Sequence, residues 1–245
     1  MGVSNRIASE TKVRQRHARF AAWAPLAACL AAASLGPSAR ADVIWDNGPP
    51  DTSLNGFQSE ENTDGDYTEV ADDFVLSSAF PAWEISDVHI AGRNLNVDPG
   101  TLDWRIRLYD DVGGAPALTP FHSVVMLPTS ATANGLWGGE GYDVSFDIPP
   151  VTVAPGSYFI SVVQLTGNAG AGGLSRWFWG ISQSFQGSEA YVDSTAFGIP
   201  RWTSAGNVGF PDTDMSFSLT GTGIPEPATG LLLGLAALPL LRRRT

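Results

Sequence analysis

The feature that most constrains the fold is an alternation of apolar and polar residues with a period of two. Within residues 102–109, Trp104, Ile106 and Leu108 occupy one set of positions and Arg105 and Arg107 the other. Successive side chains of a strand point to opposite faces of its sheet, so this segment predicts a strand with one face in the core and one in water. The same alternation recurs over residues 142–148.

The rest of the region between residues 42 and 223 also predicts strands. No stretch of it keeps a helical period over three turns, and turn residues separate the short apolar runs. Residues 156–165 are apolar on both faces, which is typical of a central strand covered on both sides. The pair Pro149-Pro150 predicts the end of the strand over residues 142–148. We therefore predict an all-β domain, an antiparallel β-sandwich of the jelly-roll type.

Residues 1–41 have the pattern of a secretory signal peptide. Basic residues precede an apolar, alanine-rich run over residues 20–35, and Ala39 and Ala41 supply small residues before a predicted cut at Asp42. Residues 26–29 also match a bacterial lipobox, which would instead produce a lipoprotein beginning at Cys29. The apolar run continues past this cysteine and a conventional cleavage site follows, which favours the signal peptide.

Residues 224–245 combine three features in a fixed order. The tripeptide Pro225-Glu226-Pro227 precedes residues 228–241, which are 14 residues without a charge, and the cluster Arg242-Arg243-Arg244 follows. A helix of that length reaches about 21 Å, which is short of the roughly 30 Å hydrocarbon core of a bilayer. It can still sit in a membrane that thins locally, with the arginines on the cytoplasmic side.

This order of tripeptide, short apolar helix and arginine cluster resembles the PEP-CTERM sorting signal of Gram-negative bacteria. In that family a membrane enzyme, the exosortase, is thought to recognise the tripeptide and process the protein there. The resemblance implies export, transient membrane tethering through the C-terminal helix, and then sorting to the cell surface or extracellular matrix, usually in bacteria that make exopolysaccharide. The alternative is an ordinary C-terminal anchor helix, which needs neither the tripeptide nor so short a span.

Residues 42–223, the predicted β-sandwich ectodomain, resemble more loosely the sandwich domains that often precede such tails. Two short motifs carry this resemblance: Ala71-Asp72-Asp73-Phe74, and the run Asp214-Met215-Ser216-Phe217-Ser218-Leu219-Thr220-Gly221. Many members of this group have no assigned activity. The motifs therefore imply a fold rather than a function.

The composition of the ectodomain restricts its chemistry. Cys29 is the only cysteine of the chain, so residues 42–223 offer no disulfide, no thiolate metal site and no cysteine nucleophile. They contain 23 acidic residues against five arginines and no lysine, a net charge of −18. Such a surface repels nucleic acid and anionic lipid and attracts cations or basic partners, so we expect no nucleic-acid binding.

Candidate catalytic residues are few, and we predict no catalytic site. His89 and His122 are the only histidines of the ectodomain, and neither lies in a serine-hydrolase signature. Two separated histidines do not make a zinc site, so we interpret both as structural or surface residues. A glycoside hydrolase needs only two facing carboxylates, and 23 acids leave that alternative open.

Residues 60–71 partly match an EF-hand calcium loop. Glu60, Asn62, Asp64 and Asp66 fall at the ligand positions 1, 3, 5 and 7 around a glycine turn, and alternating oxygen ligands suit a hard cation. The match fails at position 12, where Ala71 replaces the bidentate glutamate. Two interpretations stay open: a calcium site, to which the aspartate pair after Ala71 could add, and an acidic surface loop.

Three tryptophans are candidates for stacking on sugar rings. Trp137 lies in a glycine-rich segment, and Trp177 and Trp179 alternate so that they share one face of a predicted strand. A flat, exposed aromatic ring beside polar side chains is what a carbohydrate site requires. Core packing is the alternative, because large aromatic side chains also dominate sandwich interiors.

We therefore predict a non-catalytic protein that is secreted or sorted to the bacterial surface or matrix. Its expected role is structural or adhesive, with exopolysaccharide as partner, an exosortase-type enzyme as processing partner, and calcium as the one candidate cofactor. Two alternatives stay open: an extracellular carbohydrate-active hydrolase using a carboxylate pair, and a passive coat protein without a ligand.

Overall fold

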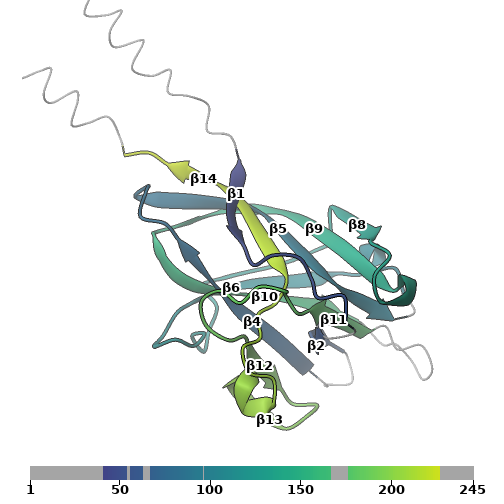
Figure 1. Ribbon diagram of the computed structural model, residues 1–245. Coiled ribbons are helices and arrows are strands. Elements are labelled where there is room, and N and C mark those ends of the chain that lie inside the picture. The colour runs from purple at the N-terminus through teal and green to yellow at the C-terminus, as the bar shows by residue number, and fades with distance from the viewer. Residues whose placement is uncertain (1–40, 54–55, 63–66, 96, 167–175, 227–245) are drawn as a thin grey trace, which may run out of the picture. The chain divides into compact units, whose positions relative to one another are not determined.

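Two seven-stranded sheets make up the part of the chain that the computed structural model describes, which is residues 41–53, 56–62, 67–95, 97–166 and 176–226 (Figure 1). The first sheet contains β1 (Asp42–Asp46), β2 (Gly56–Gln58), β5 (Ala82–Leu95), β8 (Ser130–Ala133), β9 (Gly141–Val153), β11 (Arg176–Gly180) and β14 (Phe217–Ile224). The second contains β3 (Glu60–Glu61), β4 (Tyr67–Leu76), β6 (Trp104–Asp110), β7 (His122–Met126), β10 (Gly156–Leu165), β12 (Tyr191–Ser194) and β13 (Ile199–Ser204). Three short 3-10 helices join them: η1 (Pro99–Thr101), η2 (Trp137–Gly139) and η3 (Ala205–Val208).

The strand order places segments that are distant in sequence side by side. In the first sheet β5 pairs with β9 along one edge and with β14 and β11 along the other, and β14 pairs in turn with β1. In the second sheet β10 lies between β4 and β6, as its apolar faces predict. The pairings of named strands are antiparallel except for a two-residue contact between β3 and β10. The predicted antiparallel sandwich is confirmed.

One predicted strand end is wrong. β9 continues through Pro149-Pro150 to Val153, because the pairing with β5 shifts register between Ile85 and Asp87. Ile85 pairs with Val151 and Asp87 with Asp147, so the prolines lie at the irregularity between them. A proline lacks the N–H that a regular ladder uses, and a bulge removes that demand.

Side chains from both sheets form the main core. Trp104 of β6 packs edge-to-face against Trp177 of β11, with ring centroids 4.9 Å apart, and against Phe146 of β9 at 5.5 Å. All three are fully buried. Burying an aromatic side chain of this size stabilises the fold by about 1.5–3 kcal/mol, so this cluster fixes how the two sheets face each other.

A second, smaller cluster covers the outer face of the second sheet. Tyr109 occupies the face of β6 that the alternation assigns to water, yet it is fully buried. It packs edge-to-face on Trp202 of β13, and Phe159 of β10 belongs to the same cluster. The expectation of a solvent-exposed outer face therefore fails at this end of β6, because Trp202 of β13 packs against Tyr109.

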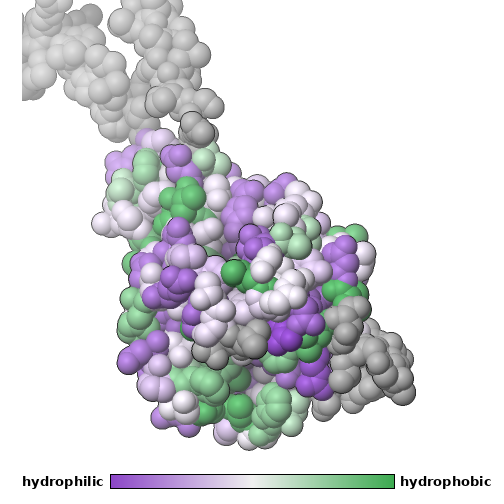
Figure 2. All heavy atoms as spheres, turned by 45° about the vertical axis from the view of Figure 1, so that its right-hand side comes forward, coloured by the Kyte–Doolittle hydropathy of each residue, from purple (hydrophilic) through white to green (hydrophobic). Residues whose placement is uncertain are grey.

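The surface is mixed in character. On the face drawn in Figure 2, hydrophilic side chains are interspersed with smaller groups of apolar ones. Among the described residues, no helix has the length and apolar character needed to cross a membrane.

Candidate functional site

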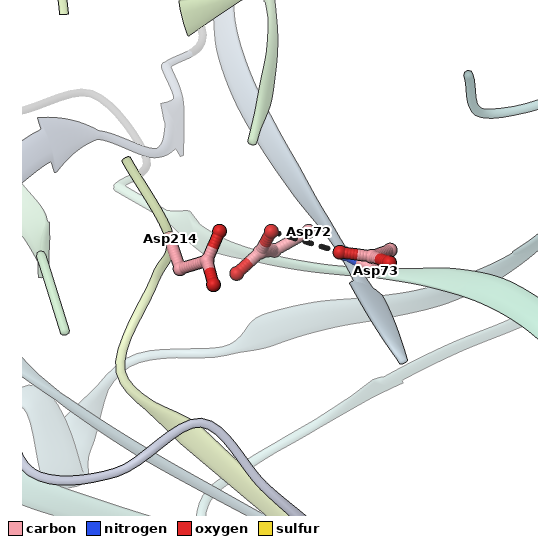
Figure 3. A group of neighbouring side chains, drawn as sticks. All are labelled: Asp72, Asp73 and Asp214. Atoms are coloured by element: carbon pink, nitrogen blue, oxygen red, sulfur yellow. Dashed lines mark hydrogen bonds between the residues drawn. The ribbon is translucent and has the colours of Figure 1, made fainter. Parts of the chain in front are cut away.

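Three aspartates come together beside β4 and form the most unusual polar group of the sandwich (Figure 3). Asp72 and Asp73 are consecutive residues of β4, and Asp214 lies three residues before β14. One carboxylate oxygen of each lies within 4.8 Å of the other two. The residues are 0%, 6% and 1% exposed, respectively. We call these three residues the aspartate cluster.

The sheet topology explains why the cluster forms at this point of β4. One edge of β4 is bonded to β10 from Ala71 to Leu76. On the other edge β12 pairs with β4 only from Thr68 to Ala71. The chain before β12 and the chain before β14 therefore contact β4 beyond Ala71, and they do so through the side chains of the cluster.

Asp72 is the most completely bonded member of the cluster. Its Oδ2 accepts hydrogen bonds from the side-chain amide of Asn47 at 2.9 Å and from the backbone amide of Met215 at 2.7 Å. Its Oδ1 accepts the backbone amide of Asp73 at 3.0 Å. One buried side chain thus joins the segment after β1, the strand β4 and the start of β14.

The other two carboxylates hold the segment that precedes β12. Oδ1 of Asp73 accepts the backbone amide of Ser188 at 3.1 Å, and Oδ2 of Asp214 accepts the backbone amide of Gln186. Oδ1 of Asp214 is buried and has no hydrogen-bond partner among the described residues. The cluster therefore ties residues 186–188 to the sandwich and leaves one buried acceptor unsatisfied.

Burial disturbs the ionisation of all three acids, and repulsion within the cluster adds to its effect on Asp72 and Asp214. Burial raises the pKa of Asp72 well above its ordinary value, and the charge of Asp214 raises it further. Burial also raises the pKa of Asp214, to about 7, with the charge of Asp73 adding to the effect. Burial raises the pKa of Asp73 against the opposing hydrogen bonds from Ser188. Without a compensating positive charge, the cluster holds protons near neutral pH.

A different polar network lies on the outer face of the same sheet. Glu69 of β4 is fully buried, and its carboxylate accepts hydrogen bonds from Arg107 at 2.7 Å and from the hydroxyl of Tyr109 at 2.7 Å. Arg107 also donates to the hydroxyl of Tyr67 at 3.1 Å. Here a positive charge accompanies the buried acid.

An open groove of about 310 Å³ runs beside this network. Its lining consists of acidic, amide, phenolic and guanidinium groups from Glu61, Asn62, Tyr67, Arg105 and Arg107. Arg105 and Glu61 form an ion pair at its edge. We call this the arginine groove, because two of the five ectodomain arginines line it.

The two ectodomain histidines lie in separate places. Nδ1 of His89 is 2.8 Å from the hydroxyl of Ser145, across the paired strands β5 and β9, in a shallow groove of about 350 Å³. His122 lies on β7, and burial lowers its pKa. The contact places a histidine nitrogen beside a serine hydroxyl, as in the base and nucleophile of a serine hydrolase. Among the described residues that line this groove, no other feature resembles such a site.

The three tryptophans that were candidates for sugar stacking lie in the interior. Trp177 and Trp179 are fully buried, and Trp137 is only 7% exposed. The indole N–H of Trp137 donates to the backbone oxygen of Ser53 at 2.7 Å, so even this loop residue packs inward. A ring without an exposed face cannot stack on a sugar, and the core-packing alternative describes all three.

The predicted calcium loop is only partly described. Glu60 is buried on β3 and accepts a hydrogen bond from the side chain of Gln58 at 2.5 Å, while Asn62 lines the arginine groove. Asp64 and Asp66 lie outside the described residues. The aspartate pair that could have added to this loop instead joins Asp214.

The sorting-signal residues also divide at the limit of the described chain. β14 ends at Ile224, and Pro225 and Glu226 follow it as exposed residues. Pro227 and the cluster Arg242-Arg243-Arg244 lie outside the described residues, as do Cys29 and residues 1–40 of the predicted signal peptide.

Sequence reasoning missed Asp214 as a site residue. Its signal was present, because Asp214 begins one of the two motifs that resemble other sandwich ectodomains, and Asp72 and Asp73 form the centre of the other. The structure brings these motifs together through the hydrogen bond from Met215 to Asp72.

Comparison with known proteins adds little to this geometry. No protein-family model matches the chain, and no curated protein matches it. One solved structure with some similarity comprises the cysteine protease and lectin-like domains of Cwp84, a surface-layer-associated protein of Clostridium difficile. The identity is 12% and the TM-score 0.40, over 64% of this chain and 32% of that one. The chain thus spans about a third of that protein, and a likeness this weak identifies neither family nor activity.

Proposed function

We propose that this chain is an exported β-sandwich protein that a PEP-CTERM-like tail sorts to the cell surface or extracellular matrix. The observation that carries the proposal is the position of the tripeptide. The last strand ends at Ile224, and Pro225 and Glu226 are exposed directly after it. A membrane-bound exosortase can therefore reach the tripeptide without unfolding the sandwich, and cleavage there leaves every described strand intact.

The N-terminal end of the sandwich fits export in the same way. β1 begins at Asp42, the residue at which the predicted signal peptide would be cut, and Asp42 pairs with Gly221 of β14. β1 and β14 lie side by side in Figure 1. Removal of residues 1–41 would thus leave the first strand whole. The signal peptide, the C-terminal apolar helix and the jelly-roll connectivity belong to this proposal.

The role that we propose at the surface is structural or adhesive, with exopolysaccharide bound in the arginine groove. Tyr67 offers an aromatic ring, while Asn62 and Glu61 offer hydrogen-bonding groups for sugar hydroxyls. The guanidinium N–H groups of Arg105 that Glu61 does not occupy donate to further sugar hydroxyls, while Arg107 holds Glu69. A ring with a few convergent polar groups is the usual composition of small-ligand sites, and here these groups line an open groove of half-buried side chains.

Sorting is tested by following the full-length chain in a Gram-negative host that carries an exosortase. The wild-type protein should leave the membrane fraction in a shortened form, as judged by mass spectrometry. Pro225→Ala with Glu226→Gln should keep the protein uncleaved and membrane-associated, whereas Asp147→Asn on the exposed part of β9 should change nothing. Release of the tripeptide variant at the wild-type rate and mass would refute exosortase processing.

Polysaccharide binding is tested with the released protein and exopolysaccharide purified from the producing organism. Retention on the polymer should be saturable and should fall several-fold in Arg105→Ala, while Trp137→Phe should bind as the wild type does. Release of reducing ends from the polymer would instead favour the hydrolase alternative. If the polymer neither retains the protein nor releases reducing ends, the passive coat protein is the alternative that is supported.

A further inference from the structure

The aspartate cluster concentrates negative charge without a compensating cation from the protein. The four ion pairs among the described residues join Arg93, Arg105, Arg107 and Arg201 to other acids, and residues 42–226 contain no lysine. Buried carboxylates normally occur with a paired cation or as metal ligands, because isolated burial of charge is costly. The cluster therefore lacks one of its usual partners.

A second observation points to what that partner is. Oδ1 of Asp214 has no hydrogen-bond partner among the described residues, although Asp214 is only 1% exposed. Its carboxylate faces that of Asp72 in Figure 3, and the ligand oxygens of the three residues lie within 4.8 Å of one another. A buried, unsatisfied acceptor beside two further carboxylates needs either a proton or a cation at short range.

The spacing and chemistry of the oxygens suit a hard divalent cation. Calcium binds oxygen ligands at about 2.3–2.6 Å, so oxygens that all lie within 4.8 Å of one another can contact one ion. Calcium also accepts irregular ligand sets, whereas magnesium needs near-ideal octahedral geometry and usually keeps several waters. A site of three carboxylates fixed by the fold therefore favours calcium.

We propose that Asp72, Asp73 and Asp214 form a calcium site. Each residue supplies at least one oxygen, and water completes the coordination, since calcium accepts six to eight oxygen ligands in flexible geometry. Oδ2 of Asp72 already accepts two hydrogen bonds, whereas Oδ1 of Asp72 accepts one and Oδ1 of Asp214 accepts none from the described residues, so these two atoms keep lone pairs for the ion. This site would bind calcium whether or not the chain is sorted or bound to polysaccharide.

The contacts of the cluster show what the ion would do. Asp73 and Asp214 hold the amides of Ser188 and Gln186, and Asp72 holds the amide of Met215. An ion among these carboxylates would link β4, the segment before β12 and the start of β14 through one centre. Calcium should therefore stabilise the native sandwich, because it binds the folded cluster and not the unfolded chain.

The experiment uses the full chain, purified in mild detergent and freed of metal with EDTA. Calorimetric titration with calcium chloride should show one site per chain, and millimolar calcium should raise the midpoint of thermal unfolding. Asp214→Asn should weaken calcium binding at least about tenfold and should abolish most of the shift in midpoint. Its circular dichroism in EDTA should match that of the wild type, because the amide keeps an oxygen for Gln186.

Two control variants separate this site from general acidity and from the loop over residues 60–66. Asp147→Asn removes an exposed charge on β9, and Asp64→Asn removes a candidate ligand of the loop; both should bind calcium with wild-type affinity. The proposal is overturned if millimolar calcium gives neither binding heat nor stabilisation. It is equally overturned if Asp64→Asn abolishes binding while Asp214→Asn does not, because calcium then belongs to the loop.

Discussion

Strand β4 contributes to two sites of buried carboxylates, and the negative charge of the two sites is balanced in different ways. Glu69 of β4 is fully buried and accepts hydrogen bonds from Arg107 and Tyr109. Asp72 follows three residues later, is equally buried, and has the two further acids Asp73 and Asp214 as its charged neighbours. One site brings its own positive charge, and the other must obtain a proton or a cation from solution.

The difference follows from what lies beside each end of the strand. Glu69 points to the outer face, where the alternation of β6 supplies an arginine at position 107. The aspartate cluster lies where β12 no longer pairs with β4, and backbone amides of passing loops take the place of a cation. Backbone amides orient carboxylates but do not neutralise their charge. The charge of Glu69 is therefore balanced within the protein, whereas the aspartate cluster needs a proton or a cation from solution.

The largest loss of stability is expected when the ion pair between Glu69 and Arg107 is broken. Arg107→Met leaves Glu69 buried without its cation, which should lower the free energy of unfolding by about 3–5 kcal/mol, measured by urea denaturation. Arg105→Met is the matched control on the same face of β6. Its partner Glu61 is 36% exposed at the side chain, so the cost there should stay below about 1 kcal/mol.

A double variant sharpens this test of Glu69. Glu69→Gln with Arg107→Met removes both charges and keeps an oxygen for the hydroxyl of Tyr109. It should recover most of the stability that Arg107→Met loses, because the penalty comes from the unpaired charge and not from the missing ion pair. Equal destabilisation in the single and double variants would show that lost packing of the arginine stem, rather than the unpaired charge, sets the cost.

The second effect is a pH dependence confined to the metal-free aspartate cluster. The pKa of Asp214 is raised to about 7 by burial and by the charge of Asp73. Asp111 adds to the same field at Asp73, while Asn47, Gln186 and Ser188 contribute only neutral donors. The folded chain therefore binds a proton that the unfolded chain has lost over most of the range between about pH 4 and pH 7.

The sign of this dependence is that stability falls as the pH rises. The contribution of Asp214 is fully present below about pH 4 and is lost as the pH passes about 7, with a size of about 4 kcal/mol. Unfolding in EDTA should be compared for the wild type and Asp214→Asn, because the difference between their curves isolates this group. A flat difference curve would contradict the raised pKa, and Asp147→Asn should follow the wild type throughout.

The contrast also shows what the sequence could predict. The period-two pattern predicted β6 correctly, and the apolar run over residues 156–165 coincides with β10, since both signals are local. The strand end predicted at Pro149-Pro150 was wrong, because the bulge that accommodates the two prolines depends on the pairing register with β5. Tyr109 was misassigned for a related reason, since burial depends on what packs over a strand. The same dependence left the three candidate tryptophans open between core packing and a ligand site.

The aspartate cluster was beyond such reasoning for a topological reason. Asp72 and Asp214 are 142 positions apart, and their contact requires the residues just before β14 to pass beside β4. The calcium prediction fell on residues 60–66 because their oxygen ligands are regularly spaced along the chain. Spacing along a chain detects ligands that share one loop, whereas a sandwich assembles ligands from strands that are neighbours only in space.

The third effect tests how tightly the cluster is enclosed. Gly187 has φ +84°, and a Cβ there would lie 2.2 Å from Oδ2 of Asp73. Gly187→Ala should therefore displace that carboxylate and strain the backbone, at a cost of about 2 kcal/mol. Gly198 is the control, because it also has positive φ but no atom within 4 Å of the place that a methyl group would occupy. If thermal unfolding shows the same loss for Gly198→Ala, backbone strain alone explains both.

The smallest effect concerns one donor of the cluster. Ser188 donates hydrogen bonds from its amide and its side chain to Asp73, and both oppose the rise in the pKa of that acid. Ser188→Ala removes the hydroxyl donor, so the pKa of Asp73 should rise further and the free energy of unfolding should fall by about 1 kcal/mol. Carbon-detected NMR titration of Asp73 and urea denaturation measure the two consequences separately. The control is Ser184→Ala, at an exposed position of the same loop, which should change neither the pKa of Asp73 nor the free energy of unfolding. A shift of that pKa in Ser184→Ala would mean that the whole segment, rather than the hydroxyl of Ser188, sets the ionisation of the cluster.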